Sequence, residues 1–255
     1  MTRDYNYGGV SSRDGEIDAI RIDKNITING NGFLIYSGLT DYWQGYQVDS
    51  MGFVIGEGCT VVINDLNIEI STHVGDKGSA FCNHGNLTLN NCDVYGTFYA
   101  LESEEIVCGG AIYNDEGAFM SINSSKIAGE VWGKDYYPDD LTAYGAVIFN
   151  KGGMTITEST LSGREYDDED HENYPSYGGG IYNEGDLNIT YSILYHNSAK
   201  MGTDIYHNGT SLYVSNSFLA SRTPDITRRN RFDFLAKYGN YTLYAEKTEN
   251  CELNT

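Results

Sequence analysis

Apolar residues recur along most of the chain in one fixed arrangement. Each copy has an apolar side chain at a first position, another two residues later, and a third five residues after that. The five clearest sets are Leu87, Leu89 and Val94; Met120, Ile122 and Ile127; Met154, Ile156 and Leu161; Leu187, Ile189 and Leu194; and Leu212, Val214 and Leu219. Alternation with a period of two predicts a β-strand, and the jump of five residues predicts a corner followed by a new strand.

A glycine-rich motif precedes each set. Its clearest copies are GGAIYN at residues 109–114 and GGGIYN at residues 178–183, and looser copies occupy 78–83, 145–150 and 202–207. The copies begin 31, 36, 33 and 24 residues apart, so the bare repeating unit has about 24 residues. Self-similarity at such a period is typical of a solenoid, a propeller or an array.

Two or three short strands per unit fit one rung of a parallel β-helix, in which each strand pairs with its counterpart one rung later, about 4.8 Å away. The sequence therefore predicts an all-β solenoid with the apolar sets stacked in its core. A β-sandwich is the alternative, but a sandwich does not require residue-for-residue ladders.

Polar and small residues repeat with the same period. The motif copies end in Asn83, Asn114, Asn150 and Asn183, which we expect to form an amide ladder that satisfies buried backbone groups. In the last copy His207 takes this place, and we expect it to break the ladder. A small residue stands two positions before the third apolar member of each set; these residues are Cys92, Ser125, Ser159, Ser192 and Ser217.

The repeats predict one elongated domain with a cap at each end, because the open ends of a solenoid core need cover. We assign residues 1–23 to an N-terminal cap, 24–222 to the repeats and 223–255 to a C-terminal cap. The last segment departs from the repeat and carries three arginines together with an aromatic cluster.

Composition and charge narrow the classes of partner. Among 255 residues, 30 Gly and 22 Tyr with only 3 Pro suit a turn-rich β-structure. The net charge of −20 argues against nucleic-acid binding and suits neutral or cationic partners, although the same charge could serve solubility alone.

Five cysteines without CxxC spacing support neither a zinc site nor a disulfide framework, so we expect buried free thiols. No apolar run approaches a membrane span, so we expect no direct membrane insertion.

Several motifs resemble a known family. NITINGNG at residues 25–32, GGAIYN, GGGIYN and LYHNSA at residues 194–199 resemble adhesin-like surface proteins of methanogenic archaea. They are also similar to repeats of chlamydial polymorphic membrane proteins, and both groups have the pectin-lyase-like right-handed β-helix. The resemblance covers about residues 17–222, with Leu194 where the polymorphic repeat has Phe. It implies a right-handed helix, an archaeal source and an extracellular place on the cell surface; residues 1–4 start no secretory signal, so an exported protein would have been trimmed.

The longer repeats contain insertions just before the returning glycine, at residues 99–108, 131–144 and 164–177, and residues 39–51 occupy a comparable place. Insertions on one face of a solenoid are often its binding face. Aromatic rings stack on the apolar faces of sugars, and carboxylates accept hydrogen bonds from sugar hydroxyls. The candidate ligand-binding residues are Trp43, Trp132, Tyr136, Tyr137, Tyr166, Tyr174, Asp139 and Asp140.

The sequence offers little chemistry for catalysis. The acidic loops could supply the two carboxylates of a glycosidase, but the motifs of pectate lyases and polygalacturonases are missing, and the five histidines lack metal-ligand spacing. We expect each histidine to be structural or solvated. Asp167, Asp168 and Asp170 could hold Ca²⁺, against the simpler alternative of a solvated acidic loop.

These patterns and the resemblance favour a non-enzymatic, adhesin-like surface module without a cofactor. We expect a monomer that binds a glycan or a protein on the surface of another cell, through loops stacked on one face of the helix. A polysaccharide lyase or glycoside hydrolase of the same fold is one alternative. A structural spacer is the other.

Overall fold

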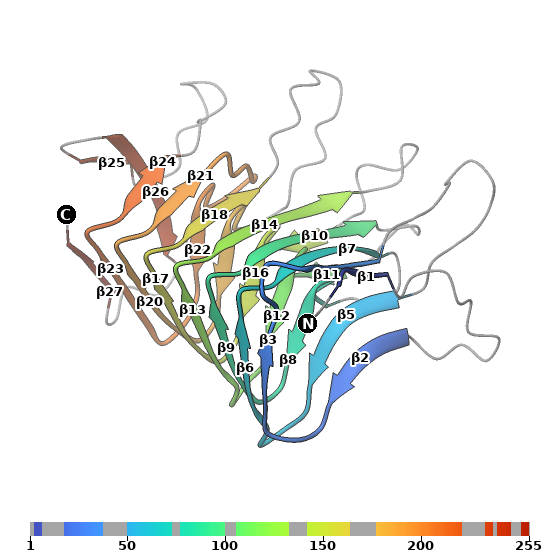
Figure 1. The fold of residues 1–255 in the computed structure, drawn as a ribbon. Helices are drawn as coiled ribbons and strands as arrows, with labels where there is room; N and C mark the ends of the chain where they lie inside the picture. Colours follow the sequence, from blue (N-terminus) through green and yellow to red (C-terminus); the bar gives the residue numbers. More distant parts are fainter. Residues whose placement is uncertain are drawn as a thin grey trace.

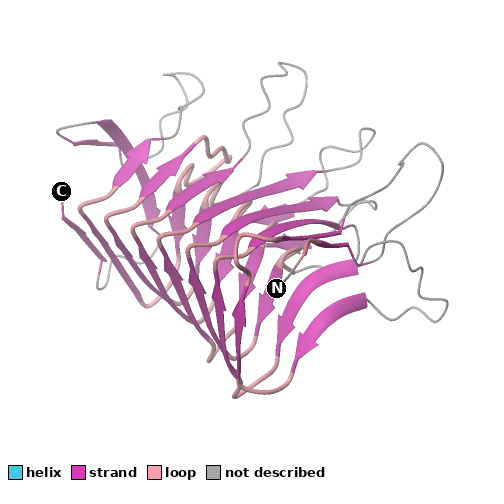
Figure 2. Cartoon of the chain, viewed as in Figure 1, coloured by secondary structure: helices cyan, strands magenta, loops and turns pink. Residues whose placement is uncertain are grey.

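The computed structural model describes residues 3–6, 18–37, 50–72, 77–99, 106–132, 142–163, 177–220, 233–236, 239–245 and 251–254. Within these residues the regular secondary structure is entirely β (Figure 2). Three long sheets, here called A, B and C, run along the molecule, and a two-stranded sheet lies beside them. No described helix is long and apolar enough to cross a membrane.

Successive strands enter the three sheets in rotation. Sheet A contains, in spatial order, β1 (Tyr5–Asn6), β4 (Leu34–Ser37), β7 (Asn67–Thr72), β10 (Asp93–Tyr99), β14 (Lys126–Trp132), β18 (Thr160–Gly163), β21 (Ile193–Tyr195) and β24 (Phe218–Ala220). Sheet B contains β2 (Asp18–Ile22), β5 (Ser50–Ile55), β8 (Phe81–Asn83), β12 (Ile112–Asn114), β16 (Ile148–Asn150), β19 (Ile181–Asn183), β22 (Ile205–His207), β26 (Gly239–Ala245) and β25 (Asp233–Ala236). Sheet C contains β3 (Ile26–Asn29), β6 (Thr60–Asn64), β9 (Asn86–Asn90), β13 (Phe119–Asn123), β17 (Gly153–Thr157), β20 (Asp186–Thr190), β23 (Ser211–Ser215) and β27 (Cys251–Asn254).

One turn of the chain therefore passes through sheets B, C and A, as in β8, β9 and β10, and the next turn stacks upon it (Figure 1). Neighbouring strands in each sheet are parallel, except that β25 pairs antiparallel with β26. The chain is a right-handed parallel β-helix, and this prediction is confirmed. Equivalent residues of successive rungs pair one to one, which excludes the alternative of a β-sandwich.

The apolar sets stack in the core as expected. Leu87 pairs with Met120, Met120 with Met154, and Met154 with Leu187, so one column of side chains runs through the interior. All the members of the five sets are at most 2% exposed and belong to one continuous hydrophobic cluster. Shielding such columns from water is the main force that holds a solenoid together.

Glycines begin each rung for a steric reason. Gly109 and Gly178 have φ of 76° and 66°, in the left-handed region that disfavours side chains. A Cβ at Gly109 would lie 2.0 Å from the carbonyl oxygen of Ile112, and one at Gly178 would lie 2.4 Å from that of Ile181. The tight corner before sheet B therefore depends on these glycines.

The asparagine ladder forms inside the corner between sheets B and C. Asn83 donates to Asn114 at 2.7 Å, Asn114 to Asn150 at 2.7 Å, and Asn150 to Asn183 at 2.6 Å, and all four are fully buried. The expectation that His207 breaks the ladder is wrong. Asn183 Nδ2 lies 2.8 Å from His207 Nδ1, so the imidazole accepts the amide hydrogen bond and continues the ladder.

The small residues form a second ladder at the corner between sheets C and A. The hydroxyl of Ser125 accepts from the backbone N–H of Cys92, and those of Ser159, Ser192 and Ser217 accept from the preceding rung in the same way. Each of these serines also donates to the carbonyl two residues before it, at 2.7–2.8 Å. The sequence predicted the small size, but hydrogen bonding explains why serine is used.

The ends of the chain contribute strands to the same sheets. Strand β1 pairs with β4 near the N-terminus, and β26 and β27 extend sheets B and C beyond β22 and β23. Strands β1 and β2 of the first segment and β26 and β27 of the last therefore pair with the repeat strands. The insertions also include ordered strands, because β11 (Ile106–Cys108) pairs with β15 (Thr142–Tyr144).

A row of side chains covers the outer face of sheet B. Tyr113, Phe149, Tyr182 and Tyr206 stack in successive rungs with ring centroids 5.0–5.4 Å apart, and all are nearly buried. Tyr144, Tyr177 and Met201 pack against this outer row. Burial raises the pKa of Tyr113 and Tyr182, and neighbouring carboxylates oppose ionisation further.

Candidate functional site

The residues proposed from the sequence fall mainly outside the described part of the chain. Trp43, Tyr136, Tyr137, Asp139, Asp140, Tyr166, Tyr174, Asp167, Asp168 and Asp170 lie outside the described residues. Trp132 is the last residue of β14, and its backbone is in register with Tyr99 of β10. The candidate surface is therefore built from the strands that lead into these segments.

The outer face of sheet A carries an aligned row of residues in which two tyrosines flank small side chains. The register places Tyr95 beside Ala128, Ala128 beside Ser162, and Ser162 beside Tyr195. Three rung spacings separate the tyrosines, which corresponds to about 14 Å. Since Ala128 and Ser162 are small, the surface is hollowed between the two rings.

A depression of about 390 Å³ occupies this place. It is lined by Tyr95, Ala128, Glu130, Ser162, Gly163, Tyr195 and His196. Its size lies in the lower part of the range of small-ligand sites. It combines apolar ring faces with a few polar groups, which is the usual composition of such a site.

Glu130 supplies an ordered carboxylate to the groove. Its side chain is 5% exposed, and the Tyr95 hydroxyl donates to Oε1 at 2.8 Å. This bond fixes both the carboxylate and the rotation of the tyrosine hydroxyl.

Tyr195 and His196 form the opposite end of the groove. Their ring centroids are 4.9 Å apart with planes inclined at 60°, and His196 has φ of 53°. The following residue holds this end in place: Asn197 Oδ1 accepts from the Gly163 N–H at 2.5 Å, and its Nδ2 donates to Asp204 at 2.8 Å. The groove is therefore built on strands and a bonded corner rather than on a long loop.

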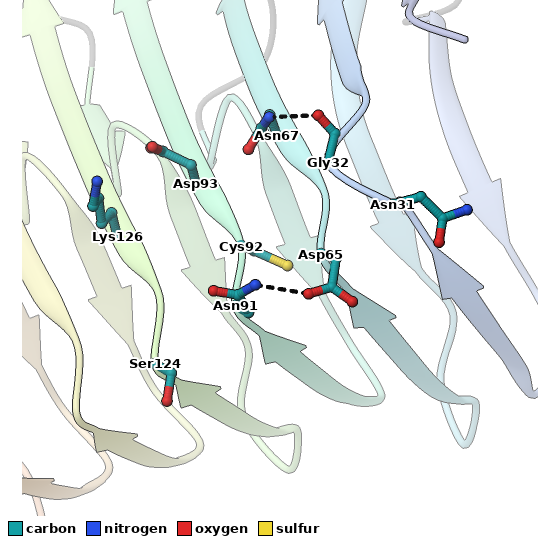
Figure 3. A pocket seen from close by; sticks show the side chains of 9 residues that line it. All are labelled: Asn31, Gly32, Asp65, Asn67, Asn91, Cys92, Asp93, Ser124 and Lys126. Carbon is teal, nitrogen blue, oxygen red and sulfur yellow. Dashed lines mark hydrogen bonds between the residues drawn. The ribbon is translucent and has the colours of Figure 1, made fainter. Parts of the chain in front are cut away.

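A second depression of about 410 Å³ follows the corner between sheets C and A (Figure 3). It contains the carboxylates of Asp65 and Asp93 and the amine of Lys126. Asn91 donates to Asp65 at 2.7 Å within it. The described residues that line this depression include no aromatic ring, so they lack the stacking surface of the sheet A groove.

Metal binding has no candidate in the described ranges, where no three His, Cys, Asp or Glu side chains are grouped suitably. Asp167, Asp168 and Asp170 lie in the segment 164–176, outside those ranges. The proposed Ca²⁺ site thus stays a prediction.

The groove residues were not predicted from the sequence, although a signal was present. Tyr95, Ala128, Ser162 and Tyr195 each follow the third member of an apolar set. Alignment of the sets therefore aligns these outward positions too. Glu130 and His196 have no such repeated signature, and only the folded strands bring them to the groove.

Comparison of the chain with protein-family models, with curated proteins and with solved structures finds no match. By its fold and its groove, the protein is a parallel β-helix solenoid with a depression on sheet A that lies between two tyrosine rings.

Proposed function

We propose that the protein is a non-enzymatic, adhesin-like module of the cell surface that binds a glycan along the outer face of sheet A. The observation that carries the proposal is the pair of tyrosines, Tyr95 and Tyr195, flanking the small residues Ala128 and Ser162. Ring faces suit the apolar faces of sugars, and the Glu130 carboxylate suits sugar hydroxyls. This extends the binding face predicted from the insertions to the strands beneath them.

The inserted segments remain part of the proposal. Strands β10 and β14 line the groove and end at Tyr99 and Trp132, where residues 100–105 and 133–141 follow. We propose that Trp132, Tyr136 and Tyr137 add further stacking surface to the same ligand. Because the inserted segments follow strands of adjacent rungs, they suit a ligand that extends across several rungs.

A binding function fits the groove better than hydrolysis. Glycoside hydrolysis generally uses two carboxyl groups on either side of the scissile bond. Among the described residues that line the groove, Glu130 supplies the single carboxyl group. Its hydrogen bond with Tyr95 also occupies one of its oxygens.

A cationic protein segment is the competing ligand, because the chain has a net charge of −20 and aromatic rings attract Lys and Arg. Ionic strength separates the two partners. Binding of a cationic segment should weaken steeply as salt rises, whereas stacking on a neutral glycan should change little.

The test is a glycan array and a cell-wall pull-down at low and high salt. The Tyr95→Ala/Tyr195→Ala variant should lose about tenfold or more in affinity, as expected when two central rings are truncated. Ser162→Phe should block binding while retaining both tyrosines. Tyr213→Ala, on the outer face of sheet C, is the matched control and should bind normally.

Four results would contradict the proposal. Unchanged binding by the double variant would remove sheet A as the site, and steep salt dependence would favour a protein partner. Failure of the parent chain to bind any glycan would favour the spacer. Turnover of a bound polysaccharide that depends on the loop carboxylates would favour an enzyme.

A further inference from the structure

Cys82, His84 and Asp115 form a connected cluster on the outer side of sheet B. Cys82 Sγ lies 3.3 Å from His84 Nε2, and His84 Nδ1 lies 2.6 Å from Asp115 Oδ2. Cys82 and His84 belong to one rung, and Asp115 belongs to the next. Both ring nitrogens of His84 therefore have a side-chain partner.

Asp115 is held in place by further hydrogen bonds. Its Oδ1 accepts from the Tyr113 hydroxyl at 3.0 Å and from the Glu116 N–H at 2.9 Å. Partial burial works to raise the pKa of Asp115, but these hydrogen bonds and the contact with His84 outweigh it and lower the pKa. Asp115 is consequently ionised at neutral pH.

An ionised carboxylate at Nδ1 fixes the tautomer of a neutral imidazole. Nδ1 carries the hydrogen that is donated to Asp115, so Nε2 keeps its lone pair and faces the Cys82 thiol. A nucleophile, an adjacent base and a group that orients the base are the three parts of an activated nucleophile. The cluster supplies all three.

We propose that Cys82 is a reactive thiol that undergoes exchange with small disulfides, with His84 as its base and Asp115 as a positioning residue. The Cys82 proton moves to His84 Nε2, and the thiolate attacks one sulfur of the disulfide. A new S–S bond forms to Cys82 as the original S–S bond breaks. The departing thiolate takes the proton from His84, so Cys82 is oxidised and half of the small disulfide is reduced to a thiol.

The surroundings favour a disulfide over an acyl substrate. Acyl transfer needs free donors for the oxyanion, but β8 lies between β5 and β12, so its N–H groups are engaged in the parallel ladder. The N–H of His84 donates to the carbonyl of Ile55 at 3.0 Å. Sulfur displacement develops no oxyanion and does not require such donors.

Access favours a small co-reactant. Cys82 is 6% exposed, while the side chains of His84 and Asp115 are 30% and 32% exposed. Among the described residues, the ionisable groups around the cluster are Tyr113, Lys77, whose Nζ lies 5.0 Å from the Tyr113 ring centroid, and Cys108, which packs against the same outer row. This site is on sheet B and is independent of the proposed glycan site on sheet A.

Two other described thiols, Cys92 and Cys108, provide internal controls. Cys92 lies 3.4 Å from the carbonyl of Asn90, and burial raises its pKa. Cys108 forms no disulfide and is half-buried, so it is more exposed than Cys82. Exposure alone therefore predicts that Cys108 reacts before Cys82, and the proposal predicts the reverse order.

The experiment treats the folded, reduced chain with uncharged 4,4′-dithiodipyridine between pH 5.5 and 8.5. Peptide mapping by mass spectrometry then gives the rate at each cysteine. At pH 6.5 Cys82 should react about tenfold or more faster than Cys108, because its proton is removed by a neighbouring base. The rate at Cys82 should stay high below pH 7, whereas the rate at Cys108 should rise steadily with pH.

Two variants test the roles of the neighbours. His84→Gln should lower the Cys82 rate at pH 6.5 by about tenfold and give it the pH profile of Cys108. Asp115→Asn should lower the rate less and change its pH profile, while matched circular dichroism and melting curves report the fold. Faster labelling of Cys108 in the parent chain, or an unchanged Cys82 profile in His84→Gln, would overturn the proposal.

Discussion

Replacement of Asn150 by alanine should destabilise the protein strongly, because this residue is at the centre of the buried asparagine ladder. Its side chain is fully buried and makes four hydrogen bonds. Its oxygen accepts from Asn114, and its two amide hydrogens are shared among three acceptors, which are Asn183 Oδ1 and the backbone carbonyls of Gly152 and Asp186. Alanine removes all four bonds, and water cannot reach the buried partner groups to replace them.

The expected cost follows from these partners. A buried hydrogen bond contributes about 1 kcal/mol, and a partner left unsatisfied costs about 1–3 kcal/mol. Asn114 keeps a bond to the Gly153 carbonyl at 3.2 Å, which reduces the loss. Together the terms predict a loss of about 3–5 kcal/mol in the free energy of unfolding.

Asn123 provides a matched control on the outside of the helix. It donates to Asn90 at 2.9 Å in a second amide ladder, but its side chain is only half-buried. Water can replace the lost bonds of Asn123→Ala, so we expect a cost of about 1 kcal/mol or less. The contrast isolates burial, since both changes remove an amide from a stacked row.

The assay is urea unfolding followed by circular dichroism and by intrinsic fluorescence. Coincident curves with unchanged slopes allow the midpoints to be compared as free energies. Equal costs for the two variants, or a cost below about 1 kcal/mol for Asn150→Ala, would refute the reasoning.

Three further changes test the other ladders. Ile189→Asp should unfold or aggregate the chain because it places an unpaired carboxylate in the core, and a soluble variant with an unchanged melting curve would contradict the core assignment. Ser159→Ala should cost about 1–3 kcal/mol by melting, since it leaves the Ser125 N–H unsatisfied, and Ser159→Cys should cost less because Cys92 occupies the same place in another rung. Burial lowers the pKa of His207 in the fold, so its contribution to stability is present above its unfolded pKa of about 6.5 and is lost as pH falls below that value. His207→Asn should remove this part of the acid dependence, and identical pH–stability curves for parent and variant would exclude it.

The fold could be predicted from the sequence because stacked rungs require equivalent residues at regular intervals along the chain. The columns through Leu87 and through Asn83 needed only an alignment of the repeats, and both occur in the structure. His207 was misjudged because the alignment showed a change of residue but not that imidazole Nδ1 can accept the same bond. The ladder continues because the imidazole of His207 offers a hydrogen-bond acceptor at the place where the other rungs have an amide oxygen.

The candidate sites were harder to predict because their residues are distant in sequence. Tyr95 and Tyr195 are separated by three rungs, and their relation depends on the small residues between them. Cys82 and His84 are neighbours in sequence, but Asp115 joins them only through the stacking of rungs. Single rungs therefore contain no complete motif for either site.

The most direct measurement of the proposed function is a crystal structure of the protein with the glycan retained on the array. We expect electron density for sugar rings over Ala128 and Ser162, between the rings of Tyr95 and Tyr195, with a hydroxyl bonded to Glu130. Sugar density confined to another face, with the sheet A groove filled only by water, would contradict it.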